Sequence, residues 1–383
     1  MRRKAVIAGA LAQKSGHGGL TWVFLEYVLG LQRLGWDVLF LDRLEPEMCV
    51  DAAGNPASLE DSVNLRYLVH IMDWFGLSDQ WSLIYDGRRF VGRPRDEVLE
   101  RVGRSSFLLN FMGYFNHEEI LAAAPRRVFL DIDPGFPQMW RELGLANVFE
   151  GHDDFLTVGA NVGRPGCNIP TCGLEWIGTP PPVVLDRWPV VPQGEAFTSV
   201  VTWRGPFGPV EYGGRTYGLR VHEFRRFAEL PRITGRPFEI ALDIHPSDGK
   251  DRAMLEAASW SIVDPASVAG DPSAYRDYIQ RSAAEFGVAK NMYVDTRSGW
   301  FSDRSICYLA SGKPVLVQDT GLRDLYPIGE GLLAFSTLDE AAAGVQEICA
   351  DYERHSRAAR RLAEGYFDSD KVLSRLLQEL GVE

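Results

Sequence analysis

The sequence predicts an α/β protein built from two Rossmann-like domains that face each other across a cleft. Short apolar runs of β type alternate with helical patterns along the whole chain, as in parallel sheets that are covered by helices. The chain has 383 residues, which exceeds the size of a usual single core. Residues 178–194 contain five prolines and have the composition of a stiff connection. We therefore expect one domain at 1–190 and a second at 191–365.

The apolar patterns predict the elements of both domains. In the first domain we expect a turn-rich connection at 85–95, helices at 20–34 and 64–75, and strands at 4–10, 37–41, 105–112, 128–133 and 155–158. In the second domain we expect strands at 197–203, 238–244, 260–263, 292–296 and 315–317. Its helices are expected at 220–230, 250–258, 273–286, 302–311, 339–352, 355–364 and 369–380.

The stretch 292–321 has the clearest internal pattern, because it predicts a strand, a helix and a second strand. Such a unit places the N-terminus of its helix at the carboxyl edge of a parallel sheet, where free N–H groups attract an anion. Ser302 can cap this helix, Ser305 can donate a hydrogen bond from its first turn, and Arg304 adds a positive charge. These residues predict a phosphate site, and an ordinary unit with a capped helix is the alternative.

Two segments of the second domain resemble GT-B fold glycosyltransferases. Residues 309–321, LASGKPVLVQDTG, are similar to the A-x-G-x-P-V segment, which in that fold holds the diphosphate of a sugar nucleotide. Residues 327–341 are similar to a further run of the same fold. The resemblance implies that the last helix, within 366–383, returns to the first domain. It also implies that Arg304, and more weakly Arg297 on the preceding loop, neutralise the diphosphate without a metal.

The first domain carries a glycine turn in a matching register. Gly18 and Gly19 precede the first helix, and GWDV at 35–38 follows at the spacing of family 4-like GT-B enzymes. In those enzymes the glycines let the backbone approach the donor, whereas a simple tight turn is the alternative. Arg204, which precedes Gly205, is similar to an arginine that contacts the donor diphosphate in the same enzymes. A surface arginine beside a glycine-rich hairpin is the alternative there.

The chain departs from the family 4-like pattern at two positions. Retaining enzymes of that type have a pair of glutamates, and the matching residues here are Gly299 and Cys307. The contacts that these glutamates make with the ribose and the sugar are therefore absent or replaced, and Asp303 is the candidate replacement. The identity of the sugar and the stereochemistry of transfer stay open.

His17 and Asp133 are the candidates for a catalytic base. Many inverting GT-B enzymes place a histidine in the loop after the first strand, where His17 lies, and the pKa of histidine suits proton abstraction. A histidine that bonds only its own turn is the alternative. Asp131 and Asp133 could instead form the metal-binding D-x-D of GT-A enzymes. Because the predicted phosphate site lies far along the chain, we interpret Asp133 as a strand-end residue that faces the cleft.

Composition narrows the class of partner. The net charge of −12 argues against a nucleic acid or an anionic membrane surface, both of which favour basic faces. No apolar run reaches the roughly 18 residues of a membrane span, and five scattered cysteines fit a reducing cytoplasm. We expect no cofactor and no metal, a nucleotide sugar as co-substrate, and a small-molecule or glycan acceptor.

The leading hypothesis is a metal-independent glycosyltransferase that uses a UDP or dTDP sugar in natural-product or glycoconjugate biosynthesis. Two alternatives share the fold. A hydrolysing nucleotide-sugar epimerase would release free nucleotide without an acceptor, and a non-catalytic binding protein would bind nucleotide and turn nothing over. The missing glutamates favour the last alternative, whereas the arginines and the glycine turn favour an enzyme.

Overall fold

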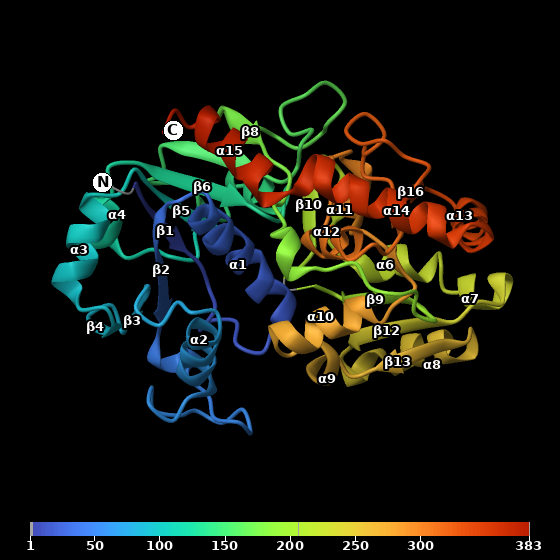
Figure 1. The fold of residues 1–383 in the computed structure, drawn as a ribbon, viewed down its shortest axis with the longest axis horizontal. Coiled ribbons are helices and arrows are strands. Elements are labelled where there is room, and N and C mark those ends of the chain that lie inside the picture. The colour runs from blue at the N-terminus through green and yellow to red at the C-terminus, as the bar shows by residue number, and fades with distance from the viewer. Residues whose placement is uncertain (1–2, 206, 383) are drawn as a thin grey trace.

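The computed structural model describes residues 3–205 and 207–382. These residues form two sheets side by side, each covered by helices (Figure 1). We call the first sheet with its helices the first lobe, and the rest the second lobe. The first sheet has the strand order β4-β3-β2-β1-β5-β6-β7-β8. Its strands are parallel except for the β3–β4 pair: β1 Lys4–Ala8, β2 Asp37–Leu44, β3 Trp81–Tyr85, β4 Arg89–Gly92, β5 Phe107–Phe111, β6 Arg127–Asp131, β7 Asp154–Thr157 and β8 Trp176–Gly178.

Helices cover this sheet, because its apolar strands have to be shielded from water on both faces. They are α1 Gly18–Arg33, α2 Val63–Trp74, α3 Arg95–Gly103, α4 Glu118–Ala123 and α5 Phe136–Glu142, with short 3₁₀ turns at Pro46–Met48 and Leu185–Arg187.

The second sheet is parallel and has the order β13-β12-β9-β14-β15-β16. The strand order reverses between β9 and β14, as in a doubly wound sheet. The strands are β9 Phe197–Thr202, β12 Phe238–Asp243, β13 Trp260–Val263, β14 Ala284–Gly287, β15 Val315–Gln318 and β16 Leu332–Phe335, and β10 Val210–Tyr212 with β11 Arg215–Tyr217 forms a separate hairpin.

The helices of the second lobe follow its strands in alternation. They are α6 Arg220–Arg225, α7 Leu230–Thr234, α8 Gly249–Ala257, α9 Pro265–Ala269, α10 Pro272–Gln280, α11 Asn291–Asp295, α12 Asp303–Ala310, α13 Leu338–Ala350, α14 Tyr352–Leu362 and α15 Ser369–Glu379, with a 3₁₀ turn at Pro246–Asp248 and a π-helical turn at Ala363–Phe367.

The strand predicted at 292–296 is wrong, because these residues belong largely to helix α11. The strand is β14, which overlaps the C-terminal end of the helix predicted at 273–286. Met292 and Tyr293 have the apolar character of a strand, but they are buried against α5 of the first lobe. β14 is extended because it pairs with β9 on one side and β15 on the other. Tertiary packing thus overrode the local preference.

Three smaller predictions also differ from the structure. The first strand ends at Ala8, two residues before its predicted end. The connection predicted at 85–95 contains the edge strand β4, which pairs antiparallel with β3. The helix predicted at 220–230 is divided into α6 and α7. The other predicted helices and strands overlap observed ones. The structure also contains elements that were not predicted, namely β3, β8, β16, α3, α4, α5 and α9.

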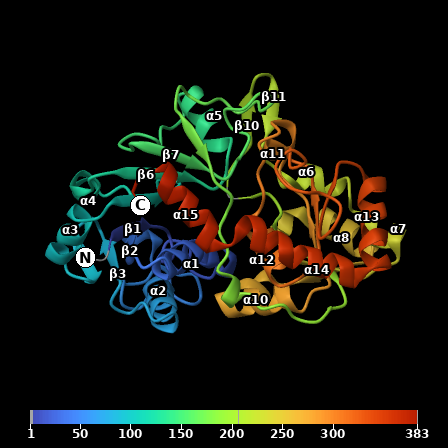
Figure 2. The ribbon, with the colours of Figure 1, turned by 45° about the horizontal axis from the view of Figure 1, so that its top comes forward.

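The last helix returns to the first lobe, as the GT-B resemblance implied. α15 packs against α1 (Figure 2). A Cβ added to Gly30 of α1 would lie 2.5 Å from Leu373 of α15. α1 also packs on α10 of the second lobe, where Trp22 Nε1 donates to the carbonyl of Pro272 at 2.9 Å. The lobes are therefore joined along α1. The domain boundary at residue 190 stays a prediction.

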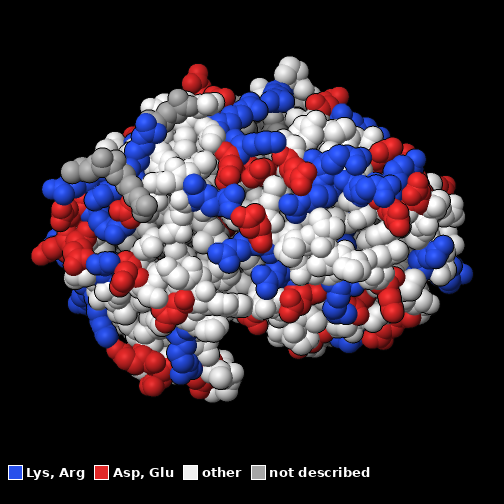
Figure 3. All heavy atoms as spheres, viewed as in Figure 1, with Lys and Arg blue, Asp and Glu red and all other residues white. Residues whose placement is uncertain are grey.

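Charges of both signs mix on the surface. Figure 3 shows acidic and basic side chains interspersed over the viewed face, and on α14 Arg357 and Arg360 pair with glutamates four residues away. In the described ranges, none of the helices is both long and apolar enough to cross a bilayer.

Candidate functional site

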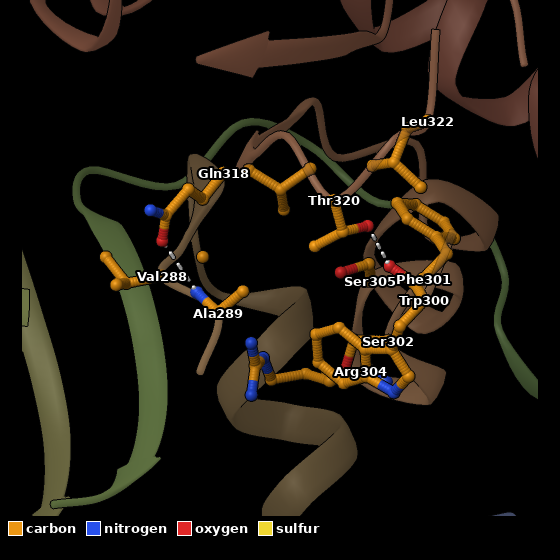
Figure 4. A pocket seen from close by; sticks show the side chains of 12 residues that line it. Val288, Ala289, Trp300, Phe301, Ser302, Arg304, Ser305, Gln318, Thr320 and Leu322 are labelled. Carbon is orange, nitrogen blue, oxygen red and sulfur yellow. Dashed lines mark hydrogen bonds between the residues drawn. The ribbon is translucent and has the colours of Figure 1, made fainter. Parts of the chain in front are cut away.

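A small pocket lies at the carboxyl edge of the second sheet (Figure 4). It lies where β14 and β15 end and where α12 begins, next to the reversal of strand order. Ligands of open α/β sheets bind outside the carboxyl ends of the strands at such a reversal. The lining residues are Gly287–Ala289, Trp300–Ser302, Arg304, Ser305, Val317, Gln318, Thr320 and Leu322.

The N-terminus of α12 forms one wall of this pocket. The Oγ of Ser302 accepts from the N–H of Arg304 at 3.2 Å, which confirms Ser302 as the cap of the helix. The Oγ of Ser305 is buried and has no hydrogen-bond partner within the described part of the chain. Because a buried hydroxyl without a partner is unfavourable, Ser305 favours a ligand with hydrogen-bonding atoms.

Arg304 connects the helix to the two strands at the reversal. Its Nε donates to Oε1 of Glu285 on β14 at 2.7 Å, and its Nη1 donates to the carbonyl of Val200 on β9 at 2.9 Å. The side chain of Glu285 is fully buried. Arg304 therefore lines the pocket as predicted, but part of its charge is already neutralised by the protein.

Arg220 is a second cation of this region, and the sequence analysis missed it. It begins α6, the first helix after β9. Arg220 is half-buried, its Nε is buried without a partner, and its Nη1 donates to the carbonyl of Thr202 at 3.4 Å. No carboxylate of the described residues lies within ion-pair distance of it. Burial, together with the charge of Arg304, lowers the pKa of Arg220 to about 10. A cation in this environment is stabilised by an anion. The available signal was a basic residue at the start of that helix.

Asp133 lies at the interface of the lobes, as predicted. It follows β6 of the first lobe, and its carboxylate accepts hydrogen bonds from Lys290 at 2.8 Å and from the hydroxyl of Tyr293, both in the second lobe. Lys290 directly follows Ala289, which lines the pocket. The sequence analysis missed Lys290 because the strand was predicted in the wrong place.

Asp131 and Asp133 point to different partners, which agrees with the strand-end interpretation. Asp131 is buried and accepts from Gln138 at 2.8 Å and Thr157 at 3.0 Å. Burial raises the pKa of Asp131 to about 7. Among residues 3–205 and 207–382, no cluster of three or more His, Cys, Asp or Glu side chains is arranged to hold a metal ion.

The glycine turn faces the second lobe, and Gly18 lies directly against the backbone of that lobe. A Cβ added to Gly18 would overlap the carbonyl oxygen of Asp271, so that this glycine is required by packing between the lobes. Gly19 and Asp303 line a second small cavity between α1 and α12. The turn and the start of α12 are thus brought together. Burial raises the pKa of Asp303, and Arg304 opposes this shift.

Three further predicted site residues line neither cavity, as is also true of Gly18 and Asp133. His17 is exposed, and its Nδ1 lies 3.1 Å from the carbonyl oxygen of Ser15. Arg204 donates twice to Asp248, with its Nε at 2.7 Å, which lowers the pKa of that carboxyl. Arg297 is exposed and has a positive φ of 52°. The roles proposed for His17, Arg204 and Arg297 stay predictions.

The positions that match the family glutamates are filled in other ways. Gly299 has a φ of 70°, and an added Cβ would lie 2.9 Å from the side-chain amide of Asn161. A glutamate would therefore be strained there. Cys307 is buried and lines the cavity between α1 and α12 together with Glu26. Burial raises the pKa of Glu26 to about 7.

Solved glycosyltransferase structures superpose on the whole chain at low sequence identity. An alpha-glucosyltransferase in complex with UDP-glucose and DNA containing an abasic site has a TM-score of 0.57 and 11% identity, with 100% of this chain and 99% of that chain covered. Sucrose-phosphate synthase from Thermosynechococcus elongatus gives 0.55 and 12%, with coverage of 100% and 99%. HepE from Anabaena, in complex with UDP and glucose, gives 0.56 and 11%, with 100% of both chains covered.

These similarities confirm the GT-B fold with its two Rossmann-like lobes. No protein-family model matches the sequence, and no curated protein matches it. The narrower resemblance to family 4-like enzymes stays a prediction.

Proposed function

We propose that the protein is a glycosyltransferase that moves a sugar from a UDP or dTDP sugar to an acceptor hydroxyl. The observation that carries the proposal is the half-buried cation Arg220, whose Nε is buried without a partner and which lies near Arg304 of the α12 pocket. A diphosphate there would supply the missing negative charge, and Ser305 and the first N–H groups of α12 would donate hydrogen bonds to it. The solved structures of the same fold with bound UDP agree with this use of the pocket.

In the proposed step the acceptor oxygen bonds to C1 of the sugar, and the bond from C1 to the diphosphate oxygen breaks. The electron pair of that bond leaves with the nucleoside diphosphate, whose charge the cations stabilise. The acceptor hydroxyl loses its proton to a base. We favour Asp133 for this role over His17, because Asp133 lies between the lobes and contacts the segment that lines the pocket.

We also propose a small-molecule or glycan acceptor and transfer that needs no divalent metal. Arg220, Lys290 and Arg304 provide positive charge without an ion. The net charge of −12 disfavours a nucleic-acid acceptor, although alpha-glucosyltransferase structures of this fold contain DNA. Turnover that persists in EDTA is the expected result, and turnover lost in EDTA but restored by Mg²⁺ or Mn²⁺ would contradict metal independence.

The direct experiment is calorimetric titration of UDP, dTDP and their common sugars, followed by turnover with and without acceptors. We expect binding of one nucleotide class and release of the nucleoside diphosphate that depends on an acceptor. Nucleotide release with isomerised free sugar and no acceptor would instead support an epimerase. Binding without any turnover across a broad acceptor panel would support a binding protein.

A further inference from the structure

Lys290 and Asp133 form a buried ion pair across the two lobes. The Nζ of Lys290 lies 2.8 Å from Oδ2 and 3.1 Å from Oδ1 of Asp133. The Lys290 side chain is 5% exposed and that of Asp133 is 16% exposed. Tyr293 donates a further hydrogen bond to Oδ1. Both oxygens of Asp133 therefore accept hydrogen bonds from the second lobe, and its charge is paired with the Lys290 ammonium group.

This ion pair lies directly behind the wall of the α12 pocket. Lys290 follows Ala289, and Tyr293 stacks on Trp300 with 4.3 Å between ring centroids; both Ala289 and Trp300 line the pocket. The Cε of Lys290 also lies 3.5 Å from the position of a Cβ on Gly205, at the carboxyl end of β9. The ammonium group of Lys290 also lies 4.8 Å from the ring centroid of Phe136. The lysine side chain has four rotatable bonds, through which this group can be redirected.

The surroundings of Lys290 are rich in positive charge. Burial lowers the pKa of Lys290, the Asp133 carboxylate opposes that shift, and the nearby Arg220 adds to it. Arg304 lies close enough to Arg220 to lower its pKa in turn. The three cations thus form a continuous group. A diphosphate in this group would attract Lys290 more strongly than a single carboxylate does, since it carries more charge and more acceptor oxygens.

We propose that Lys290 exchanges Asp133 for the donor diphosphate, and that this exchange frees Asp133 to act as the base. The inference rests on the proposed function of the cleft. Without donor, the base is held by Lys290 and Tyr293. With donor, Lys290 contacts the phosphate oxygens and Asp133 can accept the proton of the acceptor hydroxyl. The donor should consequently bind before the acceptor.

The test is a double-mutant cycle on UDP affinity, measured by calorimetry. Asp133→Asn removes the competitor for Lys290, so that UDP should bind more tightly, on the order of fivefold or more. Lys290→Met removes the phosphate contact, so that UDP should bind more weakly, on the order of tenfold. The double variant should resemble Lys290→Met alone, because without Lys290 the removal of Asp133 frees no cation for the phosphate.

An ion pair that only holds the lobes together predicts a different pattern. In that case Asp133→Asn and Lys290→Met would change UDP affinity in the same direction, which would overturn the exchange. Tyr293→Phe provides a second variant that loosens Asp133 without removing a charge, and it should tighten UDP binding more modestly. Lys290→Arg should keep most of the affinity. Thermal unfolding of each variant checks that it is folded.

The proposed function and the proposed exchange of Lys290 can be disproved separately. If the wild-type protein does not bind UDP or dTDP at all, the proposed function falls and the exchange falls with it. If the wild type binds a nucleotide but Asp133→Asn and Tyr293→Phe do not bind it more tightly, only the exchange is wrong.

Discussion

Arg304 donates from Nε to Oε1 of Glu285 at 2.7 Å, and the Glu285 side chain is fully buried at the reversal of strand order. The residue that the sequence selected for the donor diphosphate is therefore also a structural residue. Any experiment on Arg304 has to separate these two roles.

Arg304→Ala should destabilise the protein by about 3–5 kcal/mol, because it leaves Glu285 as a buried charge without its partner. Chemical denaturation measures this loss. The double variant Arg304→Met with Glu285→Gln should recover much of the stability while binding UDP weakly. Wild-type stability in Arg304→Ala would show that the pair does not support the fold.

Arg220→Gln should weaken UDP binding by about 10- to 100-fold, the range for a hydrogen bond to a charged group. Its folding stability should stay the same or rise, because an unneutralised, half-buried cation is removed. Arg204→Gln is the matched control. Since Asp248 already neutralises Arg204, its effect on UDP affinity should be about threefold or less. Equal losses in both variants would favour Arg204 as a donor contact.

Asp133→Asn should lower kcat by about 100-fold or more while the variant still binds UDP, because the base for the acceptor is lost. His17→Ala should lower kcat far less, since His17 is exposed and bonds its own turn. Steady-state kinetics with a saturating donor distinguish the two. The opposite order of effects would assign the base to His17.

Gly18→Ala should destabilise the protein by about 1–3 kcal/mol, the usual cost of overpacking. The added Cβ meets the backbone of Asp271, which cannot move without separating the lobes. Gly19→Ala is the control, because its Cβ would meet the Tyr275 ring at 3.0 Å and a ring can shift. Urea denaturation compares the two variants, and an equal tolerance of alanine at both positions would contradict the packing role of Gly18.

The raised pKa of Glu26 should make the folding stability depend on pH. Glu26 is buried, accepts from Trp188 Nε1 at 2.7 Å, and has a pKa raised from 4.5 to about 7 by burial. The folded state therefore keeps its proton in a pH range where the unfolded state loses it. Stability is lost as pH rises from about 4.5 to about 7, by roughly 3 kcal/mol for this group.

Glu26→Gln removes this titration, so the stability of the variant relative to the wild type should increase across the same pH window and level off above it. Urea unfolding at several pH values measures the difference. A difference that stays constant from pH 4.5 to 7.5 would show that Glu26 is ionised in the folded protein.

Local pattern predicted much of the fold because most elements bury an apolar face with helical or strand periodicity. The helix that begins after Ser302 is an example, since its cap, its apolar spacing and Gly312 at its end all lie within one short segment. β14 was not predicted, because its four residues, AEFG, are held extended by pairing with the strands on both sides and not by their own conformational preference.

The sequence by itself determined the two-lobed α/β architecture and one wall of the site, with Ser302, Arg304 and Ser305, because each depends on residues that are neighbours in the chain. Only the tertiary structure decided which charges meet. Asp133 pairs with Lys290 because the two sheets place their carboxyl edges together. Arg220 lies near Arg304 because β9 and β14, which precede their helices, are neighbours in the second sheet. Periodicity describes the environment of each element, whereas the pairing of charges between lobes depends on how those elements are placed in space.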